Sequence, residues 1–147
     1  MRALIQRVDK SSVKINGKTY SSINKGILVF VGIKQSDDEK IIDWMIKKII
    51  NLRIFEDENG KMNLSVKDIK GEILIVSQFT LYGNCKKGNR PNYTDAAKPE
   101  IARQIYENFL DKLKKVYPYK VASGIFGAMM EIELINNGPV TLFIERD

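Results

Sequence analysis

The segment that most constrains the fold is residues 27–33, which contains no polar side chain. Its isoleucines, valines and phenylalanine are typical of β-strands. A strand with one face in water would alternate apolar and polar residues, so this segment predicts a strand buried on both faces. The rest of the chain must therefore cover both sides of a β-sheet.

Other segments have the composition of strands and turns. Asn16-Gly17 is the strongest two-residue hairpin signal, because both positions tolerate positive φ. Near the C-terminus, two strands are expected to be joined by a turn over residues 136–139. The predicted strands are residues 3–8, 12–15, 18–21, 27–33, 72–79, 127–135 and 140–144.

Two segments have the apolar periodicity of amphipathic helices. Ser36 and Glu39 have the spacing of a capping box, which predicts that the first helix is capped at Ser36. Pro99 suits the first turn of a second helix that extends to about Val116. The apolar positions at helical spacing are Ile42, Met45, Ile46, Ile49 and Ile50 in the first helix, and Ile101, Ile105, Phe109 and Leu113 in the second.

The order of elements is rich in strands, with two helices and no regular βαβ alternation. It predicts a single α+β domain over residues 1–147, with mainly antiparallel strands in a barrel-like sheet. No apolar stretch approaches the roughly 20 residues that a membrane span requires. The first residues lack the long apolar core of a signal peptide, so a cytoplasmic location is expected.

Two absences limit the chemistry. The chain has no histidine, which excludes Ser-His-Asp triads, Cys-His dyads and histidine-bound zinc. Its one cysteine, Cys85, cannot form an internal disulfide or a thiolate cluster. We expect no metal and no cofactor. An enzyme of this composition must use hydroxyls, amides, carboxylates, amines or groups of its substrate.

The charge favours a polyanionic partner such as a nucleic acid. Lysine and arginine total 24 against 18 aspartates and glutamates, a formal net charge of +6. The apolar signal lapses over residues 82–98, the longest expected loop. Its basic side chains are either solvated or, with two tyrosines, grip RNA. The residues concerned are Lys86, Lys87, Arg90, Lys98, Tyr82 and Tyr93.

The segment Ser77-Gln78-Phe79-Thr80 is a candidate site, because polar side chains at the end of a buried strand often line a cleft. They could equally satisfy local backbone groups. A hydroxyl nucleophile at Ser77 or Thr80 would need a base, and none lies adjacent in the sequence. The hydroxyls could instead orient a substrate, or backbone N–H groups could form an oxyanion hole. The spacing leaves these alternatives open.

Two further candidates lie far apart in the sequence. Gly138-Pro139 is compatible with a simple turn, but it would also present bare carbonyls and a rigid wall at the rim of a site. Such a wall could reject a side chain of one hand. Arg7 interrupts an apolar strand. It either points to solvent or is a partly buried donor that holds carbonyl groups or a phosphate.

Taken in order, the motifs resemble those of the bacterial and eukaryotic-type D-aminoacyl-tRNA deacylases over essentially the whole chain. Where that family usually has Asp before Gly-Pro, this chain has Asn137. Each motif alone is weak, but all of them in order are specific. The shared segments are residues 4–8 (Leu-Ile-Gln-Arg-Val), 52–55 (Leu-Arg-Ile-Phe), 60–64 (Gly-Lys-Met-Asn-Leu), 77–80 (Ser-Gln-Phe-Thr), 90–91 (Arg-Pro) and 136–141 (Asn-Asn-Gly-Pro-Val-Thr).

The resemblance implies a homodimer of barrel-like subunits that hydrolyses the ester of D-aminoacyl-tRNA, and of glycyl-tRNA mischarged on tRNA-Ala. It implies that the Gly138-Pro139 bond is cis, enters the partner's site, excludes L-amino acids and is fixed by Arg7. The partner molecule would be aminoacyl-tRNA, bound through its terminal adenosine and its D-amino acid or glycine.

The resemblance also implies roles around that adenosine. Ser77 and Gln78 would shape the pocket, and Ala102 would leave room for the nucleoside. Phe79 would offer its backbone N–H near the scissile ester. Thr80 matches a residue once proposed as the nucleophile in this family.

The missing histidine bears on that last role. A covalent nucleophile at Thr80 is disfavoured, whereas attack assisted by the 2′-hydroxyl of the tRNA needs no side-chain base. The hypothesis is therefore that backbone groups and RNA do most of the chemistry. A non-catalytic RNA-binding module suits the same charge and is a rival. A metal hydrolase is disfavoured, because the chain has no histidine or cysteine cluster.

Overall fold

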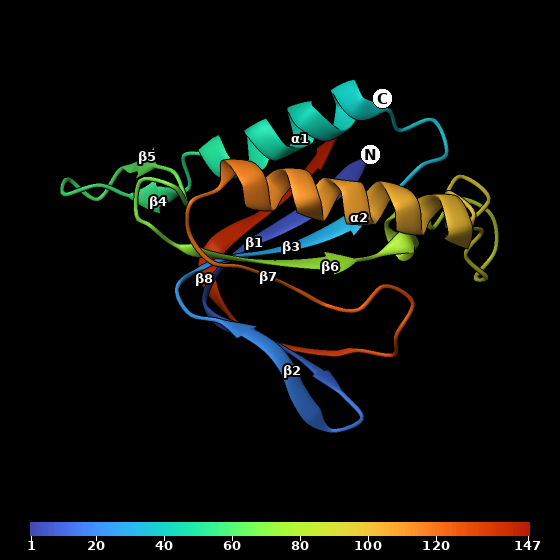
Figure 1. Cartoon of the computed structure of the whole chain (residues 1–147), viewed down its shortest axis with the longest axis horizontal. Coiled ribbons are helices and arrows are strands. Elements are labelled where there is room, and N and C mark those ends of the chain that lie inside the picture. Colours follow the sequence, from blue (N-terminus) through green and yellow to red (C-terminus); the bar gives the residue numbers. More distant parts are fainter.

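The computed structural model describes residues 1–147 and shows a curved sheet with two helices over one face (Figure 1). The main sheet has the order β2-β1-β3-β6-β7, and β8 also pairs with β1. A small separate sheet contains β4 (Phe55–Glu56) and β5 (Met62–Leu64). The strands of the main sheet are β1 (Arg2–Ile15), β2 (Lys18–Ile23), β3 (Gly26–Gly32), β6 (Glu72–Ser77), β7 (Val121–Ser123) and β8 (Glu131–Glu145).

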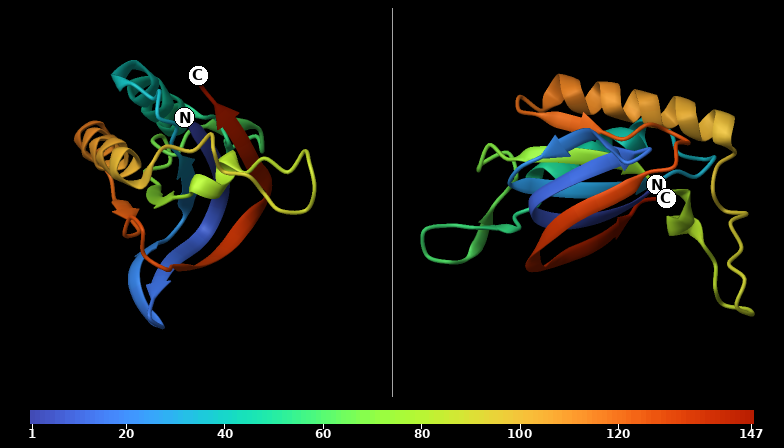
Figure 2. Two further views of the ribbon diagram at one scale, coloured as in Figure 1. Left: turned by 90° about the vertical axis from the view of Figure 1, so that its right-hand side faces the viewer. Right: turned by 90° about the horizontal axis from the view of Figure 1, so that it is seen from below.

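The sheet curls because β1 is long and pairs with different strands along its length. β3 pairs antiparallel with residues 2–8 and β2 with residues 11–15, while β8 pairs with β1 from Arg2 to Lys14. Ser21 Oγ of β2 donates a hydrogen bond to the Ser123 carbonyl of β7 at 2.9 Å, which brings the two ends of the sheet together (Figure 2). The predicted barrel-like α+β architecture is confirmed.

The direction of the strands is only partly as predicted. All three partners of β1 run antiparallel to it, in agreement with the expectation. β6 pairs in parallel with both β3 and β7, so the sheet is mixed. The segment before β7 is a helix, which allows a crossover that parallel strands require.

β3 confirms the prediction of a strand buried on both faces. Ile27, Val29 and Val31 belong to a core of 25 buried residues, whereas Leu28 belongs to a second core of six. The larger core includes the apolar faces of both helices, and the smaller one includes Val13 of β1 and Ile23 of β2. The sheet is therefore packed on one side against helices and on the other inside its own curl.

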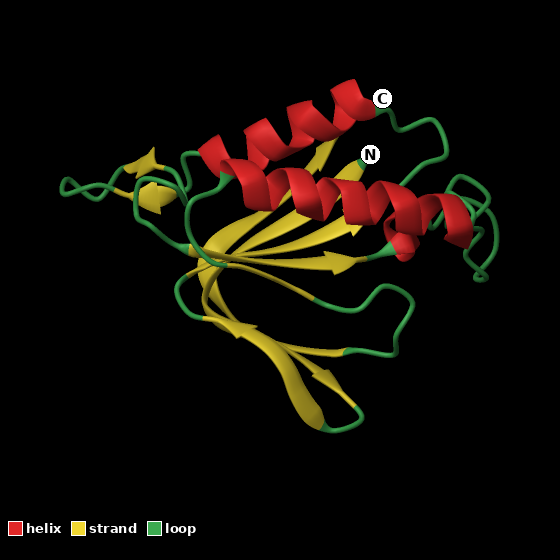
Figure 3. Cartoon of the chain, in the orientation of Figure 1, coloured by secondary structure: helices red, strands yellow, loops and turns green.

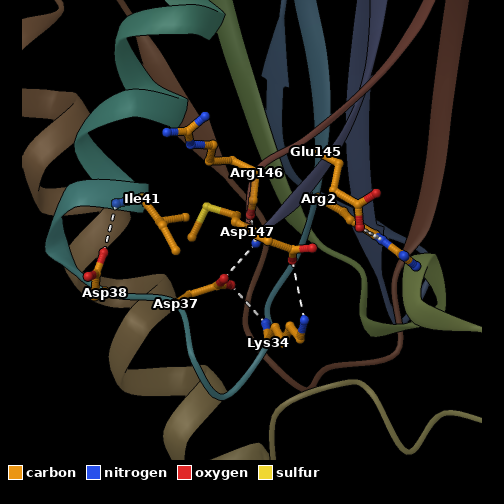
Figure 4. Close-up of polar contacts among 9 residues, drawn as sticks. Arg2, Lys34, Asp37, Asp38, Ile41, Glu145, Arg146 and Asp147 are labelled. Atoms are coloured by element: carbon orange, nitrogen blue, oxygen red, sulfur yellow. Dashed lines mark hydrogen bonds and ion pairs between the residues drawn. The ribbon is translucent and has the colours of Figure 1, made fainter.

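The helices α1 (Glu39–Asn51) and α2 (Pro99–Val116) lie side by side over the sheet (Figure 3). The predicted apolar face of α1 is buried, and α2 begins at Pro99 as expected. Neither helix is both long enough and apolar enough to cross a membrane. The predicted capping box is wrong, because Asp38 caps α1 by accepting a hydrogen bond from the Ile41 N–H at 3.0 Å (Figure 4).

The late start of α1 follows from the buried side chain of Asp37. Its carboxylate accepts hydrogen bonds from the Met1 amino group at 2.5 Å and from the Lys34 N–H at 2.8 Å (Figure 4). The Met1 amino group also donates to the Arg146 carbonyl at 2.7 Å. These bonds tie the start of β1 and the end of β8 to the turn before α1, and leave Ser36 exposed.

The two predicted turns have opposite outcomes. Asn16 and Gly17 have φ of 51° and 74° and join β1 to β2, as predicted. The predicted pair of C-terminal strands is wrong, because β8 is one strand and starts four residues later than expected. Gln6 of β1 is opposite Thr141 and Val8 is opposite Asn136, so residues 137–140 all lie opposite the single residue Arg7. We call residues 137–140 the β8 bulge.

Candidate functional site

A cleft of about 690 Å³ opens where β6 ends, beside the first turn of α2. Thirteen of its 18 lining residues are hydrophobic. Its other walls come from the ends of β3 and from residues 126–130. A volume of this size and a mainly apolar lining with a few polar groups are typical of small-molecule sites.

The structure brings four of the predicted site residues into this cleft. Ser77, Gln78 and Phe79 line it where β6 passes into the short 3-10 helix η1 (Phe79–Tyr82). Ala102 lines it from α2 and is only 8% exposed, so a larger side chain there would fill part of the cleft. Thr80 is exposed, does not line the cleft, and is hydrogen-bonded through Oγ1 to Gln78 Nε2.

The end of β6 offers backbone donors. The first N–H groups of a helix have no acceptor within that helix, and in η1 these include the N–H groups of Phe79 and Thr80. The strand end itself is fixed, because the Gln78 N–H donates to the Val31 carbonyl at 2.8 Å. Of Phe79 and Thr80, only Phe79 lines the cleft, so its N–H is the donor available for the alternative in which a backbone N–H stabilises an oxyanion.

The hydroxyls beside these donors have no base. The side-chain partner of Thr80 is the Gln78 amide, which cannot take up a proton at neutral pH. Ser77 is half-buried and makes no side-chain hydrogen bond to a carboxylate or a lysine. The structure contains no group of three or more cysteine, aspartate or glutamate side chains that could hold a metal ion. A covalent hydroxyl mechanism therefore has no proton acceptor at this site.

The cleft also contains residues that the sequence did not indicate. Residues 126–130 form a wall, although a strand was expected from residue 127, and Gly124 and Gly127 were the available turn signals. Phe126 in this wall lies under the Arg103 guanidinium, 5.2 Å from its ring centroid. Elsewhere in the lining of the cleft, the ring of Tyr93 meets the exposed ring of Phe79 edge to face at 5.2 Å.

Tyr82 does not belong to this site. Its side chain is buried, with the Arg2 guanidinium 4.3 Å from the ring centroid. Burial raises the pKa of its hydroxyl far above the ordinary value. In the alternative in which two tyrosines help the basic loop to grip RNA, Tyr82 is therefore not accessible, whereas Tyr93 is exposed.

Arg7 is buried, so the alternative in which it points to solvent is wrong. Its guanidinium donates three hydrogen bonds to carbonyl oxygens: from Nε to Asn137 at 3.1 Å, from Nη2 to Gly138 at 3.2 Å and from Nη1 to Ile54 at 2.7 Å. The Gly138–Pro139 peptide bond is cis, and both residues are exposed. Arg7 therefore holds the carbonyl side of the β8 bulge.

Two asparagines hold the β8 bulge from its other side. Asn136 Nδ2 donates to the carbonyls of Arg7 and Val140, both at 3.1 Å. Asn137 Nδ2 donates to Asp9 Oδ1 at 2.8 Å. The residue that departs from the usual Asp therefore pairs with a carboxylate of this chain, which a second Asp could not do.

The register keeps the β8 bulge away from the cleft of its own chain. Arg7 pairs with Ile27 and Ile27 with Ile73, whereas Ser77 pairs with Val31. Ser77 thus lies four residues beyond Ile73, the residue of β6 that is level with Arg7 across the sheet. At 3.3 Å per residue, Ser77 and Arg7 are about 13 Å apart along the strand direction. Neither Gly138 nor Pro139 lines the cleft.

The chain is similar to known proteins over almost its whole length. The model of the family described as D-Tyr-tRNA(Tyr) deacylase matches residues 4–145. D-aminoacyl-tRNA deacylases of Thermosipho melanesiensis and Aquifex aeolicus are 53% and 55% identical, over 99% of this chain and 97% of each relative.

Two solved structures have the same fold. A c-Myc DNA unwinding element binding protein has a TM-score of 0.96 and 44% identity, over 100% of this chain and 99% of the other. A probable eukaryotic D-amino acid tRNA deacylase has a TM-score of 0.81 at 18% identity, over 97% of both chains, which shows the fold alone. With a family model that covers residues 4–145 and relatives more than half identical, the chain belongs to the D-aminoacyl-tRNA deacylase family.

Proposed function

We propose that the chain hydrolyses the ester that joins a D-amino acid to the terminal adenosine of tRNA, in the cytoplasm. The observation that carries this proposal is the cleft at the end of β6, in which Ser77, Gln78 and Phe79 meet Ala102. Its apolar walls suit a nucleobase, and the small Ala102 leaves space beside α2. The relatives at 53% and 55% identity are named for this activity.

The chemistry follows from what the cleft contains. Water attacks the ester carbonyl carbon, and the backbone N–H groups at the start of η1 stabilise the oxyanion that forms. The bond to the ribose oxygen then breaks, and this oxygen leaves with a proton as the free hydroxyl. The neighbouring 2′-hydroxyl of the same ribose relays the proton, because the site has no side-chain base.

Selectivity for the D-amino acid is assigned to a second subunit. In a homodimer, the β8 bulge of one subunit enters the cleft of the other. Its carbonyls accept hydrogen bonds from the amino group of the substrate, and Gly138-Pro139 leaves no room for an L side chain. Three observations support this arrangement: Gly138 and Pro139 are exposed, the bulge is fixed by Arg7, and it lies away from its own cleft. Exposed Leu142 and Phe143 on the same strand suit burial against a partner.

Glycine has no side chain, so the same wall admits it. We therefore include glycyl-tRNA mischarged on tRNA-Ala among the substrates. The test is release of amino acid from D-Tyr-tRNA, L-Tyr-tRNA and Gly-tRNA-Ala by the wild-type chain. We expect the D and glycyl esters to be cleaved and the L ester to be spared. Equal cleavage of D and L esters would contradict the wall, and tRNA binding without any ester loss would indicate an RNA-binding module.

The Thr80 hydroxyl has its own test in Thr80→Val, which removes the hydroxyl and keeps the shape. We expect less than a tenfold loss of kcat on D-Tyr-tRNA, because the Thr80 hydroxyl is hydrogen-bonded to the Gln78 amide and does not line the cleft. A loss above about 10³-fold, roughly 4 kcal/mol of barrier, would show that the hydroxyl itself takes part in the reaction. Substitution of the terminal ribose by its 2′-deoxy form should be far more damaging.

A further inference from the structure

Residues 84–92 form an arm at the mouth of the cleft. Asn84 and Asn92 close its base through two backbone hydrogen bonds of 2.7 and 3.0 Å. Between them the chain leaves the body of the molecule and returns (Figure 2). Tyr93, the next residue, lines the cleft and contacts Phe79. The base of the arm is therefore attached to the site itself.

The arm is positively charged and has no internal compensation. Lys86, Lys87 and Arg90 are exposed, and none of them forms an ion pair. Residues 84–94 contain no aspartate or glutamate. By contrast, Lys112 on α2 lies between the carboxylates of Glu39 and Asp43. The charges of the arm are therefore available to an anionic partner.

The positive charge continues from the arm to the cleft. Lys98 is exposed and lines the cleft directly before α2. Arg103, in the first turns of α2, lies over the ring of Phe126, which lines the cleft. A nucleoside in the cleft therefore lies beside Lys98, and the strand attached to it would pass the arm at the mouth of the cleft.

We propose that the arm binds phosphates of the 3′ strand of tRNA while the terminal adenosine occupies the cleft. This inference rests on the proposed function. Four residues separate Asn84 from Gly88 at the tip, a reach of at most about 14 Å. A stacked strand advances about 3.4 Å per nucleotide, so the arm can follow roughly four nucleotides from the cleft. It therefore covers the unpaired 3′ end and the first phosphates of the acceptor stem.

Contacts of this kind fix position without reading sequence, because every nucleotide offers the same phosphate. They suit a protein that must accept many different tRNAs. The binding energy comes from a part of the substrate remote from the ester. Loss of the arm charges should therefore weaken binding of tRNA and leave the reaction of a substrate without phosphates unchanged.

The test compares two triple variants that lower the net charge equally. The first, Lys86→Ala/Lys87→Ala/Arg90→Ala, removes the arm charges. The control, Lys40→Ala/Lys47→Ala/Lys114→Ala, removes three exposed, unpaired lysines of α1 and α2. Binding of uncharged tRNA is measured against salt concentration. Hydrolysis is measured with D-Tyr-tRNA and with D-tyrosyl-adenosine, which has the ester and no phosphate.

For the arm variant we expect at least a tenfold rise in Kd for tRNA at 0.1 M salt. We also expect its salt slope to fall by about 2, since each phosphate contact on a single strand contributes about 0.7. Its kcat/KM should fall on D-Tyr-tRNA and stay within twofold of wild type on D-tyrosyl-adenosine.

Two results would overturn the inference. Equal losses of tRNA binding in the control variant would show a diffuse effect of net charge. Equal losses on D-tyrosyl-adenosine and tRNA in the arm variant would show damage to the cleft. Because the binding measurement uses uncharged tRNA, it judges the arm even if the wild-type chain cleaves no ester, a result that would contradict only the proposed function.

Discussion

At the scale of single residues, Arg7 is a buried cation whose partners are backbone carbonyls. The nearest carboxylate, Glu56, is 4.0 Å away and exposed. A buried charge is tolerated only when its donors are satisfied, and here three carbonyls from two separate segments satisfy them. The planar fork of a guanidinium reaches all three at once, which a lysine ammonium on a flexible chain cannot do.

We therefore expect Arg7→Lys to lower the free energy of unfolding by about 2–4 kcal/mol, since hydrogen bonds to charged groups contribute about 1.5–3 kcal/mol each. Urea denaturation measures this change. The matched control is Arg53→Lys, because Arg53 is exposed and bonds only Asn63. The control should lose less than about 1 kcal/mol. Equal losses in the two variants would contradict a special role for the buried fork.

Asn137 makes a second prediction at this scale. In Asn137→Asp, a carboxylate would replace the amide that donates to Asp9 at 2.8 Å, and the two like charges would push the β8 bulge out of place. We expect kcat/KM on D-Tyr-tRNA to fall about tenfold, or roughly 1.4 kcal/mol. Asp9→Asn in the same chain should restore most of the activity. If Asn137→Asp alone were as active as wild type, the hydrogen bond between Asn137 and Asp9 would not position the bulge.

At the scale of elements, the two helices are held together at their exposed edges by Lys112. It contacts Glu39 and Asp43 of α1, and Asn108 Nδ2 donates to Glu39 at 2.6 Å. The hydrogen bond from Lys112, together with that from Asn108, holds the pKa of Glu39 below its ordinary value. The contact therefore links the pairing of α1 and α2 to pH.

A carboxylate with a lowered pKa in the folded state stabilises the fold above its unfolded pKa, and this stability is lost as the pH falls through the folded pKa. We expect Lys112→Met to have a lower Tm than wild type at pH 6, and the difference to shrink as the pH falls below the ordinary pKa of a glutamate and then through the lowered pKa of Glu39. Thermal unfolding across this range measures it, with Lys115→Met as the control, because Lys115 has no ion pair. A difference in Tm that is independent of pH would mean that only packing was changed.

Local sequence signals predicted the elements that depend on local physics. The periodicity of α1 and α2, the Asn16-Gly17 turn and the fully apolar β3 are all of this kind. The continuity of β8 was missed, because pairing with β1 carries the strand through a Gly-Pro that would otherwise end it. The cap of α1 was misplaced, since only the fold shows that Asp37 is buried.

The candidate site divides in the same way. Polar residues at the end of β6 indicated a cleft, and Ser77, Gln78 and Phe79 do line one. Ala102 carries no chemical signal of its own and came only from the resemblance. Residues 126–130 were missed, because a wall built by tertiary contacts leaves no pattern in the sequence.

At the scale of the whole molecule, a cleft and a bulge that lie apart in one chain predict a site shared between two. The variants Gln78→Ala, in the cleft, and Pro139→Ala, in the bulge, should each have low activity. When equal amounts of the two variants are mixed, unfolded and refolded together, half of the dimers should contain one chain of each kind. Each mixed dimer has one site with both parts intact, so about a quarter of the wild-type activity should return.

Activity on D-Tyr-tRNA measures this recovery, and light scattering measures the dimer. The control is each variant refolded alone, which should recover nothing. Activity of the mixture equal to the mean of the two variants, in chains shown to form dimers, would place the cleft and its wall in the same subunit.

The β8 bulge is bounded on both sides by residues paired to β1, Asn136 opposite Val8 and Thr141 opposite Gln6. Within the bulge, Val140 is buried and the carbonyls of residues 137 and 138 are bound by Arg7, so exposed Gly138 and Pro139 are the positions that can be exchanged without disturbing the core. For protein engineering, if the bulge acts as the wall proposed above, substitutions at these two positions would change the range of substrates while the hydrolytic machinery stays as it is.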